Sequence, residues 1–251
     1  MPPRLGSLDL AKWAESVPTI EGYRTEPWTM KAARVLELRM EITDELADRL
    51  VPRTMHPSIP QYAIFNVTEY PDSPVGKFSI AEVRIAGRTG VRPRAHVLRS
   101  VVDTEEARKA LAARWGFPVH PGDVSIEQRH DRVVGRAMID DRLALQVEQL
   151  DREPVGGNDI QYIASMHLAR NEADGKLVLV QVDPEYVFSK AERGRPSVVR
   201  LDNEAFRADG YLELTTPISA SFAICDVTLP KIRYVCDPEL PALQGTTKVA
   251  A

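Results

Sequence analysis

The chain has 251 residues, 43% of them hydrophobic, and a formal net charge of −4 at pH 7. This length can bury the core of one large domain, and acids and bases are interspersed, so no basic stripe indicates a nucleic-acid partner. The first ten residues lack the basic and apolar regions of a signal peptide, and no apolar run approaches the ~18 residues of a membrane span. We therefore expect a cytoplasmic protein with no membrane partner.

Helical and extended patterns alternate through the first part of the chain. Residues 8–17 have helical spacing behind a possible Asp9 N-cap, and Thr43 is placed to cap a helix that Pro52 ends. Strands are predicted at residues 34–40, 62–68 and 78–84. The turn-rich residues 70–76 join the last two of these strands into a hairpin or meander.

A helix is predicted at residues 105–114, where Asp103 and Thr104 are placed to cap it. Strand patterns dominate around and after it, at residues 95–102, 124–128, 132–139, 143–150, 160–169, 177–182, 197–201 and 220–229. Crossover helices do not recur between these strands, as they would in a parallel sheet. The pattern predicts a mainly β, antiparallel fold with a few helices.

Arginines gather in residues 84–99, where Gly87, Gly90 and Pro93 interrupt the pattern. The segment has no aromatic platforms, so it is a weak nucleic-acid signal. Two interpretations are open: a solvated loop, or an anion site that faces the entrance of a pocket.

Three blocks of the sequence resemble the acetoacetate decarboxylase superfamily. In the first block, residues 114–120 (RWGFPVH), a helix that carries small residues runs into an aromatic-proline pair. Residues 43–52 (TDELADRLVP) are similar to the family's early helix, and residues 212–230 (LELTTPISASFAICDVTLP) are similar to its closing strands. In the family two lysines follow the aromatic-proline pair. The first forms a Schiff base with a β-keto acid, and the second lowers the pKa of the first. Val119 and His120 occupy these positions here, and a valine cannot form an imine.

The resemblance covers roughly residues 30–237 and implies the cone-like antiparallel β-barrel of that family, with peripheral helices. We therefore expect residues 1–29 to be an N-terminal extension with a short helix, residues 30–237 to be the decarboxylase-like domain, and residues 238–251 to be a C-terminal tail. Because the family forms multimers, the resemblance also implies a homo-oligomer.

The family's pocket holds an arginine and two glutamates beside the Schiff base. Ungapped counting places the glutamates at Phe65 and Ile80 and the arginine at Ala33, which would make the pocket largely apolar. If the alignment is shifted by one residue, Arg34 takes the position of the family's arginine. If it is shifted by two residues, Glu82 takes the position of the second glutamate, and a shift of two preserves the facing along a strand. The expected substrate-binding residues are Lys31, Arg34, Phe65, Ile80, Phe117, Val119 and Tyr162.

His120 and Glu82 are the expected catalytic residues. His120 follows the Phe-Pro turn, and an imidazole with an ordinary pKa near ~6.5 suits proton transfer at neutral pH, with Glu82 as its partner. The alternatives are that His120 is a loop residue and Glu82 a surface carboxylate. Three interpretations of Lys31 are open: a solvent-facing lysine, a group that binds a carboxylate of the substrate, or a relocated imine-forming amine. Tyr162 is a hydrogen-bonded core group or a pocket contact.

No metal or cofactor is expected, because the histidines are scattered without ligand spacing. Cys225 and Cys236 are expected to be reduced core thiols. The Gly-x-Ser-x-Gly motif of serine hydrolases is absent.

Two classes of function remain. The first is an enzyme of specialised metabolism that performs acid-base chemistry, as an isomerase, hydro-lyase or cyclase, on a small keto- or enol-bearing substrate without a Schiff base. The second is a non-catalytic binder or carrier of an apolar small molecule. A further alternative is a decarboxylase that uses Lys31. The fold alone does not choose among them.

Overall fold

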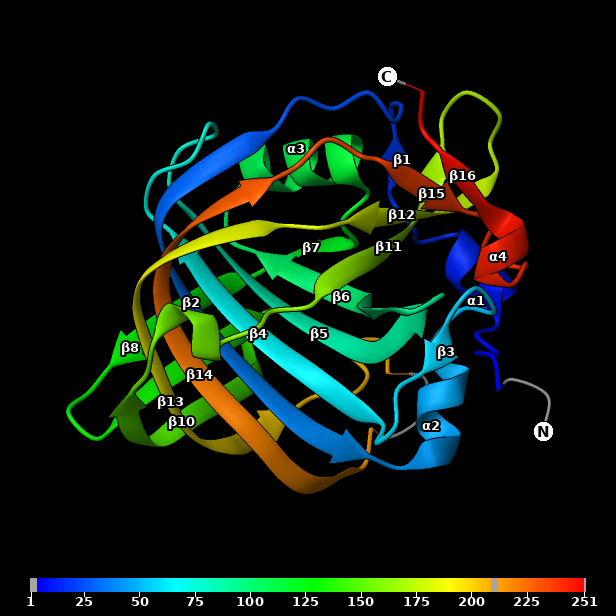
Figure 1. Ribbon diagram of the computed structural model, residues 1–251. Helices are drawn as coiled ribbons and strands as arrows, with labels where there is room; N and C mark the ends of the chain where they lie inside the picture. The colour runs from blue at the N-terminus through cyan, green and yellow to red at the C-terminus, as the bar shows by residue number, and fades with distance from the viewer. Residues whose placement is uncertain (1–3, 209–211, 251) are drawn as a thin grey trace.

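The computed structural model describes residues 4–208 and 212–250, and strands dominate it (Figure 1). The helices are α1 (Leu10–Ala14), α2 (Asp44–Arg49), α3 (Glu105–Trp115) and α4 (Ala242–Gly245), with a 3-10 helix at Gly157–Asp159. The strands are β1 (Thr19–Ile20), β2 (Trp28–Ile42), β3 (His56–Pro57), β4 (Tyr62–Tyr70), β5 (Phe78–Thr89), β6 (Arg92–Val102), β7 (Val119–Pro121), β8 (Asp123–Gln128), β9 (Arg132–Ile139), β10 (Arg142–Pro154), β11 (Ala164–Asn171), β12 (Leu177–Val182), β13 (Glu185–Leu201), β14 (Leu214–Leu229), β15 (Tyr234–Cys236) and β16 (Thr246–Lys248). None of the helices in these two ranges is long and apolar enough to cross a membrane.

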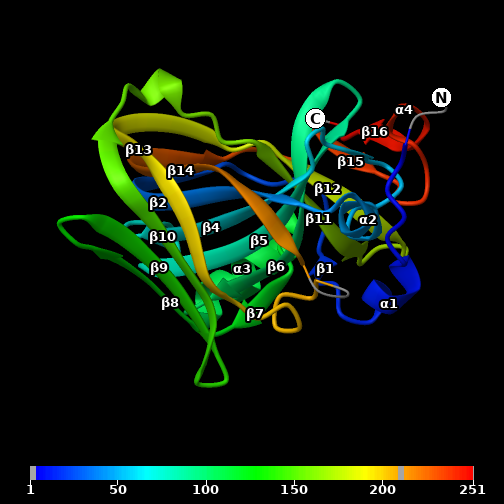
Figure 2. The same cartoon turned by 90° about the horizontal axis from the view of Figure 1, so that it is seen from below.

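The strands form one curled sheet. Its main path runs β16-β15-β12-β11-β6-β5-β4-β2-β14-β13-β10-β9-β8, and most neighbours are antiparallel. Parallel pairing occurs between β1 and β11, β11 and β6, and β6 and β7. The sheet curls so far that β8, at one end of the path, contacts β4, β5 and β6 (Figure 2). The prediction of a mainly β, antiparallel, cone-like fold with a few peripheral helices is confirmed, as a curled sheet with two open ends.

Alternation of side chains gives the sheet two buried faces. One face packs against α3 and carries, among others, Ile80 and Val102; we call it the α3 face. The other packs against β9 and β10 and carries Leu36 and Phe65; we call it the β9 face. The facing of each strand residue therefore decides which chemistry it can join.

The arginine-rich residues 84–99 form a hairpin and not a loop. β5 and β6 pair from Ile80 to Thr89, and the turn between them holds Gly90 with a φ of 59°. Of the residues that suggested a loop, Gly87 and Pro93 lie within strands. Glycine suits position 87 because a Cβ there would lie 2.8 Å from the His56 carbonyl oxygen of β3.

α3 begins where the sequence predicts, but its expected side-chain caps do not form. Thr104 stands at the N-cap without a capping hydrogen bond, and Asp103 Oδ1 accepts from the backbone N–H of Ser79 (2.8 Å). Thr43 and Asp9 also stand at N-cap positions without such bonds. The N-cap positions predicted for α1, α2 and α3 are therefore correct, although the proposed capping hydrogen bonds are not made.

Gly116 ends α3 and lets it dock on the sheet. Its φ is 66°, in the left-handed region, and its N–H bonds to the carbonyls of Leu111 and Ala112. A Cβ at this position would lie 2.8 Å from the Cβ of Ala169 on β11. Glycine satisfies both the backbone conformation and the close approach.

Gly116→Ala is expected to lower the free energy of unfolding by about 2–4 kcal/mol, because left-handed strain and overpacking against Ala169 add. Gly76→Ala is the matched control, since Gly76 has a φ of 82° but open space around it. It should lose only about 1 kcal/mol. Urea unfolding of both variants measures the difference, and equal losses would contradict the contact with Ala169.

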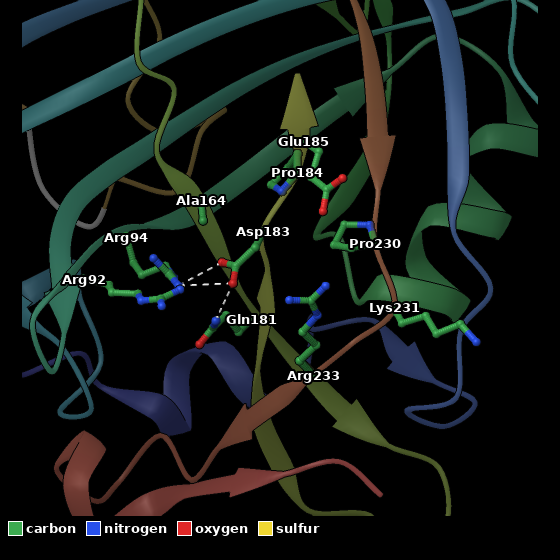
Figure 3. A pocket seen from close by; sticks show the side chains of 10 residues that line it. All are labelled: Arg92, Arg94, Ala164, Gln181, Asp183, Pro184, Glu185, Pro230, Lys231 and Arg233. Carbon is green, nitrogen blue, oxygen red and sulfur yellow. Dashed lines mark hydrogen bonds and ion pairs between the residues drawn. The ribbon is translucent and has the colours of Figure 1, made fainter. Parts of the chain in front are cut away.

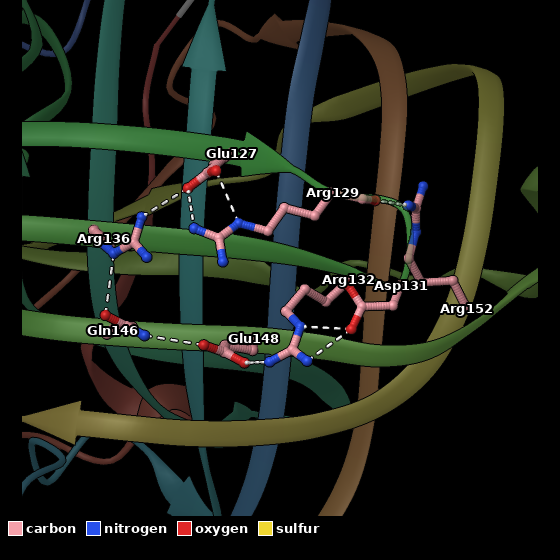
Figure 4. A network of polar contacts seen from close by, with 8 residues as sticks. All are labelled: Glu127, Arg129, Asp131, Arg132, Arg136, Gln146, Glu148 and Arg152. Carbon is pink, nitrogen blue, oxygen red and sulfur yellow. Dashed lines mark hydrogen bonds and ion pairs between the residues drawn. The ribbon is translucent and has the colours of Figure 1, made fainter.

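Charged side chains cover the solvent side of β8, β9 and β10 (Figure 4). Glu127 accepts hydrogen bonds from Arg129 and Arg136, which lower the pKa of its carboxyl to about 2, with Arg129 as the larger cause. Arg132 pairs with Glu148 on β10 (3.1 Å). Because most of these groups are exposed, the network keeps this side of the sheet solvated and adds little to stability.

Both ends of the described chain pack on the sheet. The Gly6 N–H donates to the Met55 carbonyl (2.9 Å), and Trp13 of α1 is buried. At the other end β16 pairs with β15. Cys225 and Cys236 are buried and free, as predicted, and burial raises the pKa of Cys225 to about 12.

Candidate functional site

A row of polar side chains crosses five neighbouring strands on the α3 face. Cross-strand register aligns its members directly: Ser221 on β14, Glu37 on β2, Asn66 on β4, Glu82 on β5 and Ser100 on β6. We call this the polar row. The four members from β2 to β6 are each no more than 5% exposed. Burying such groups is costly unless they are bonded, so their partners define what the row can do.

Glu82 is held by its neighbours at both carboxylate oxygens. Arg84, two residues along β5 and on the same face, donates from Nη2 to Oε2, and Ser100 Oγ donates to Oε1 (2.9 Å). Burial works to lower the pKa of Arg84, but the charge of Glu82, with help from Tyr186 and Glu37, raises it overall. The guanidinium is therefore permanently charged in an interior position, which a carboxylate must balance.

A second pair repeats this arrangement on β2. Arg39 donates from Nε and Nη2 to Oε1 of Glu37 (3.0 and 2.8 Å) and also from Nη2 to the Gln161 carbonyl. Each of these two pairs leaves one buried polar atom without a partner among the described residues: Oε2 of Glu37 and Nε of Arg84. The polar groups of a small ligand can form the hydrogen bonds that these two atoms lack, by donating to Glu37 Oε2 and accepting from Arg84 Nε.

Aromatic hydroxyls surround these charges. The pKa values of Tyr70, Tyr162 and Tyr186 are all raised, chiefly by burial, so the phenols are neutral donors at physiological pH. Tyr162 packs edge-on against Tyr186 (5.0 Å between ring centres). The charges of Glu82 and Arg84 also act on buried His167, whose pKa burial lowers to about 4. His167 is therefore neutral as well.

A cleft of about 220 Å³ adjoins the Glu37 end of the polar row. Glu37, Arg39 and Ser221 line it, together with Asp159 and Gln161 from the loop between β10 and β11. The next residue of that loop, Tyr162, accepts a hydrogen bond from Ser221 Oγ (3.5 Å). The cleft is smaller than the roughly 300–1,000 Å³ pockets of drug-sized ligands. It therefore suits a ligand of a few non-hydrogen atoms.

The structure brings several expected site residues onto one face. Glu82 lies in the polar row, and Ile80, Phe117, Val119 and Tyr162 belong to or pack against the same apolar cluster on the α3 face. Val119 is paired with Ser100, so the position that the sequence resemblance assigns to the family's first lysine lies beside the polar row. Glu82 is buried and not a surface carboxylate. The shift of two residues, which preserves facing, therefore places it on the same face as Ile80.

Other expected residues lie elsewhere. Phe65 is on the β9 face, because it lies one residue from Asn66 and strand side chains alternate. His120 follows Val119 on β7, so it points away from Glu82; its ring is half-buried, and its Nδ1 is 2.8 Å from the Pro121 carbonyl oxygen. The structure does not bring His120 and Glu82 together.

The two expected cations on β2 are also paired away from the polar row. Arg34 donates to Glu69 Oε2 (2.7 Å) and lies over the Phe222 ring, one residue out of phase with Glu37. Lys31 is 57% exposed at its side chain and pairs with Asp226 (2.6 Å). A register shift between β14 and β2 at this point turns Lys31 to solvent.

All lysines of the described chain are exposed. They are Lys12, Lys31, Lys77, Lys109, Lys176, Lys190, Lys231 and Lys248. A Schiff-base lysine requires an amine with a lowered pKa, which burial or a nearby cation supplies. The described residues place no buried lysine on the α3 face.

Sequence reasoning missed Arg84, Glu37, Ser100 and Tyr186. A signal for the charged ones was present: Glu37-x-Arg39 and Glu82-x-Arg84 both put an acid and a base two residues apart in otherwise apolar strands. Spacing of two places both charges on the same face of a strand. Two such pairs predict a buried charged cluster if the strands lie near each other, and β2 and β5 flank β4.

The fold is shared with solved structures of low sequence identity. Acetoacetate decarboxylase from Legionella pneumophila is similar with a TM-score of 0.72 and 16% identity, over 84% of this chain and 88% of that chain. The enduracididine biosynthesis enzyme MppR complexed with pyruvate has a TM-score of 0.65 and 14% identity, over 82% and 89%. An acetoacetate decarboxylase-like enzyme from Sphingomonas wittichii RW1 has a TM-score of 0.62 and 14% identity, over 82% and 94%. No protein-family model and no curated protein sequence matches the chain. The likeness shows that the chain has the acetoacetate decarboxylase fold, and the chemistry has to be argued from its own residues.

Proposed function

We propose that the protein is an enzyme that performs acid-base chemistry on a small keto- or enol-bearing carboxylic acid, without a Schiff base, at the Glu82–Arg84 pair. The observation that carries this proposal is a buried carboxylate fixed by Arg84 and Ser100 on the face that also holds Val119. A structure of one similar enzyme contains pyruvate, a keto acid, which supports the substrate class.

The proposed chemistry uses the charges already in place. Arg84 holds the carboxylate or carbonyl oxygen of the substrate, and Glu82 removes the proton from the carbon beside the carbonyl. The electrons of that C–H bond move to the carbonyl oxygen, where the guanidinium and a neutral phenol such as Tyr186 stabilise the enolate. Return of the proton at another carbon gives isomerisation, loss of a β-substituent gives elimination, and attack on an internal electrophile gives cyclisation.

Proton exchange tests this proposal without knowledge of the product. The protein is incubated in D₂O with a panel of 2-keto and 3-keto acids, and the proton signal beside each carbonyl is followed by NMR. At least one acid should exchange faster than in buffer, in a saturable manner. If none exchanges although a panel member or an apolar probe stabilises the fold, the non-catalytic binder or carrier is the correct alternative.

Borohydride treatment in the presence of acetoacetate or pyruvate is expected to add no mass to the protein. The lysines are exposed, and Lys31 is paired with Asp226, so none lies in the buried surroundings that activate a Schiff-base lysine. Intact-protein mass spectrometry checks this. A reduced adduct that disappears in Lys31→Ala would support the decarboxylase alternative instead.

A further inference from the structure

A hollow of about 300 Å³ gathers cations at the start of β6 (Figure 3). Ser100 lies near the other end of that strand. Arg92 and Arg94 come from the start of β6, Asp183 follows β12, and Arg233 precedes β15. The arginine-rich hairpin therefore contributes to a concave site. This is the anion-site interpretation that the sequence left open.

Arg94 is the buried member of this site. It is 5% exposed, its Nη1 donates to the Pro93 carbonyl (2.8 Å), and its Nη2 pairs with Asp183 (3.0 Å). Its Nε finds no partner among the described residues. Gln181 Nε2 donates to the same carboxylate (2.7 Å), so Asp183 is shared between two donors. One shared carboxylate leaves the Arg94 guanidinium incompletely satisfied.

Two further guanidinium groups of the hollow are uncompensated. Arg92 and Arg233 are exposed and form no ion pair with any described residue. Lys231 pairs with Glu26 (3.3 Å) outside the hollow, and Glu185 is the second acid of the lining. Positive charge therefore exceeds negative charge in a site whose arginines present planar forks of donors, the geometry that oxyanions fit.

The hollow lies on the side of the sheet opposite the polar row. Arg94 is followed by Ala95, which packs in an apolar cluster with Ile64 and Ala86. Ile64 and Ala86 share strand faces with Asn66 and Arg84, so Arg94 points to the other side. Arg94 pairs in register with Ala164 of β11, a small side chain that leaves room there. The cations are thus available to a ligand that does not touch Glu82.

Arg233 connects this hollow with two others. It also lines a hollow of about 470 Å³ with Arg92 and Arg94, and one of about 740 Å³ with Tyr23, Ile232 and Tyr234. The largest of these three hollows offers aromatic and aliphatic surface beside the cations. A ligand with an anionic group and an apolar organic part would therefore fit these adjoining hollows.

We propose that the Arg92–Arg94–Arg233 hollow binds the phosphate group of a phosphorylated small molecule, whose organic part lies along the neighbouring hollow that Tyr23 and Tyr234 line. A phosphate dianion can accept from several guanidinium groups at once, whereas a carboxylate has one charge and two oxygens. The site is distinct from the one proposed for proton transfer and does not depend on it.

Isothermal titration calorimetry at fixed ionic strength tests the site with inorganic phosphate, phenyl phosphate and benzoate. Phenyl phosphate should bind in a saturable manner, more tightly than inorganic phosphate, and at least about tenfold more tightly than benzoate. Arg92→Ala and Arg233→Ala should each weaken phenyl phosphate binding by about tenfold, as loss of a charge-assisted hydrogen bond does. Both arginines are exposed, so neither variant is expected to disturb folding.

Arg195→Ala is the matched control, because Arg195 is an exposed arginine paired with Asp151 on the far strands. It should leave phenyl phosphate binding unchanged, as should Glu82→Gln. Absence of saturable binding to the wild-type protein would overturn the proposal, as would an equal loss in Arg195→Ala. Benzoate that binds as tightly as phenyl phosphate would overturn the assignment to phosphate.

Discussion

Glu82→Gln is expected to lower the rate of substrate proton exchange by about 10²–10⁴-fold, the usual contribution of a positioned acid-base group. The amide keeps the shape of the side chain: its oxygen can still accept from Arg84 and its NH2 group can donate to Ser100 Oγ, but it cannot take up a proton. The exchange assay in D₂O, run at saturating substrate, measures the loss in the step itself. Near-uniform loss across all panel substrates is expected, because the carboxylate acts on the reacting carbon.

The same change also leaves the Arg84 charge without its carboxylate, and breaking a buried ion pair costs about 3–5 kcal/mol of stability. Glu192→Gln is the matched control. Glu192 is 7% exposed and accepts from Nε of Arg152 (2.8 Å), so it is a buried Glu–Arg pair outside the polar row. This variant should lose stability but retain exchange. If both variants lose exchange in proportion to unfolding, Glu82 is structural and the proposal fails.

His120→Ala tests whether His120 takes part in proton transfer, as the sequence suggested, or lies outside the site, as its position on β7 indicates. The half-buried ring lies on the side of β7 that faces away from Glu82, and its Nδ1 is close to the Pro121 carbonyl. We expect the exchange rate to change by less than about threefold, within the scatter of surface substitutions. A loss comparable to that of Glu82→Gln would return His120 to the catalytic role that the sequence suggested.

The fold was predictable because its signals are local. Alternating strands, a proline after the early helix and the small-residue helix before Phe117-Pro118 each constrain a short segment, and their order matches the family. The candidate site was only partly predictable because it depends on facing. A miscount of one residue moves a side chain to the other face, which is why Phe65 and Arg34 were expected in the pocket and are not there.

Contacts between distant strands were beyond the reach of pattern reasoning. Nothing local to Ser100 says that it donates to Glu82, and nothing near Arg84 says that Tyr186, about a hundred residues later, lies beside it. The Ser100–Glu82 contact arises from the pairing of β6 with β5, and the effect of Tyr186 on Arg84 indicates that β13 passes near β5. Charged residues two apart in an apolar strand are the part of this cluster that a sequence can reveal.

Acid is expected to destabilise the protein between pH 6.5 and 4 through two buried histidines. The ring nitrogens Nδ1 of His96 and His167 lie 2.7 and 2.9 Å from the carbonyl oxygens of Leu50 and Trp115, to which each neutral ring donates, and both Nε2 atoms are buried without a described partner. Burial lowers the pKa of each histidine to about 4, against the smaller opposing effect of the backbone bond. Both histidines are therefore neutral in the folded protein.

The sign follows from proton uptake. Above pH 6.5 the two histidines are unprotonated in both the folded and the unfolded state, and the full stability is present. Below pH 6.5 the unfolded chain binds protons at these histidines, whereas the folded protein binds them only near pH 4. At ~1.4 kcal/mol per pKa unit, each histidine removes about 3 kcal/mol by pH 4. Two such losses are comparable to the total stability of many domains, about 5–15 kcal/mol.

Urea unfolding at intervals from pH 7.5 to pH 4.5 measures this loss. His96→Asn and His167→Asn each keep a donor near the Nδ1 position and remove the titrating ring, so each should lower the stability at pH 7.5 but flatten its pH dependence. His130→Asn, at an exposed turn, should leave the dependence unchanged. Glu127 titrates below this window, because its arginine partners lower the pKa of its carboxyl to about 2 from an ordinary value near ~4.5. A double variant that still loses stability as steeply between pH 6.5 and 4.5 would show that groups other than His96 and His167 cause the acid sensitivity.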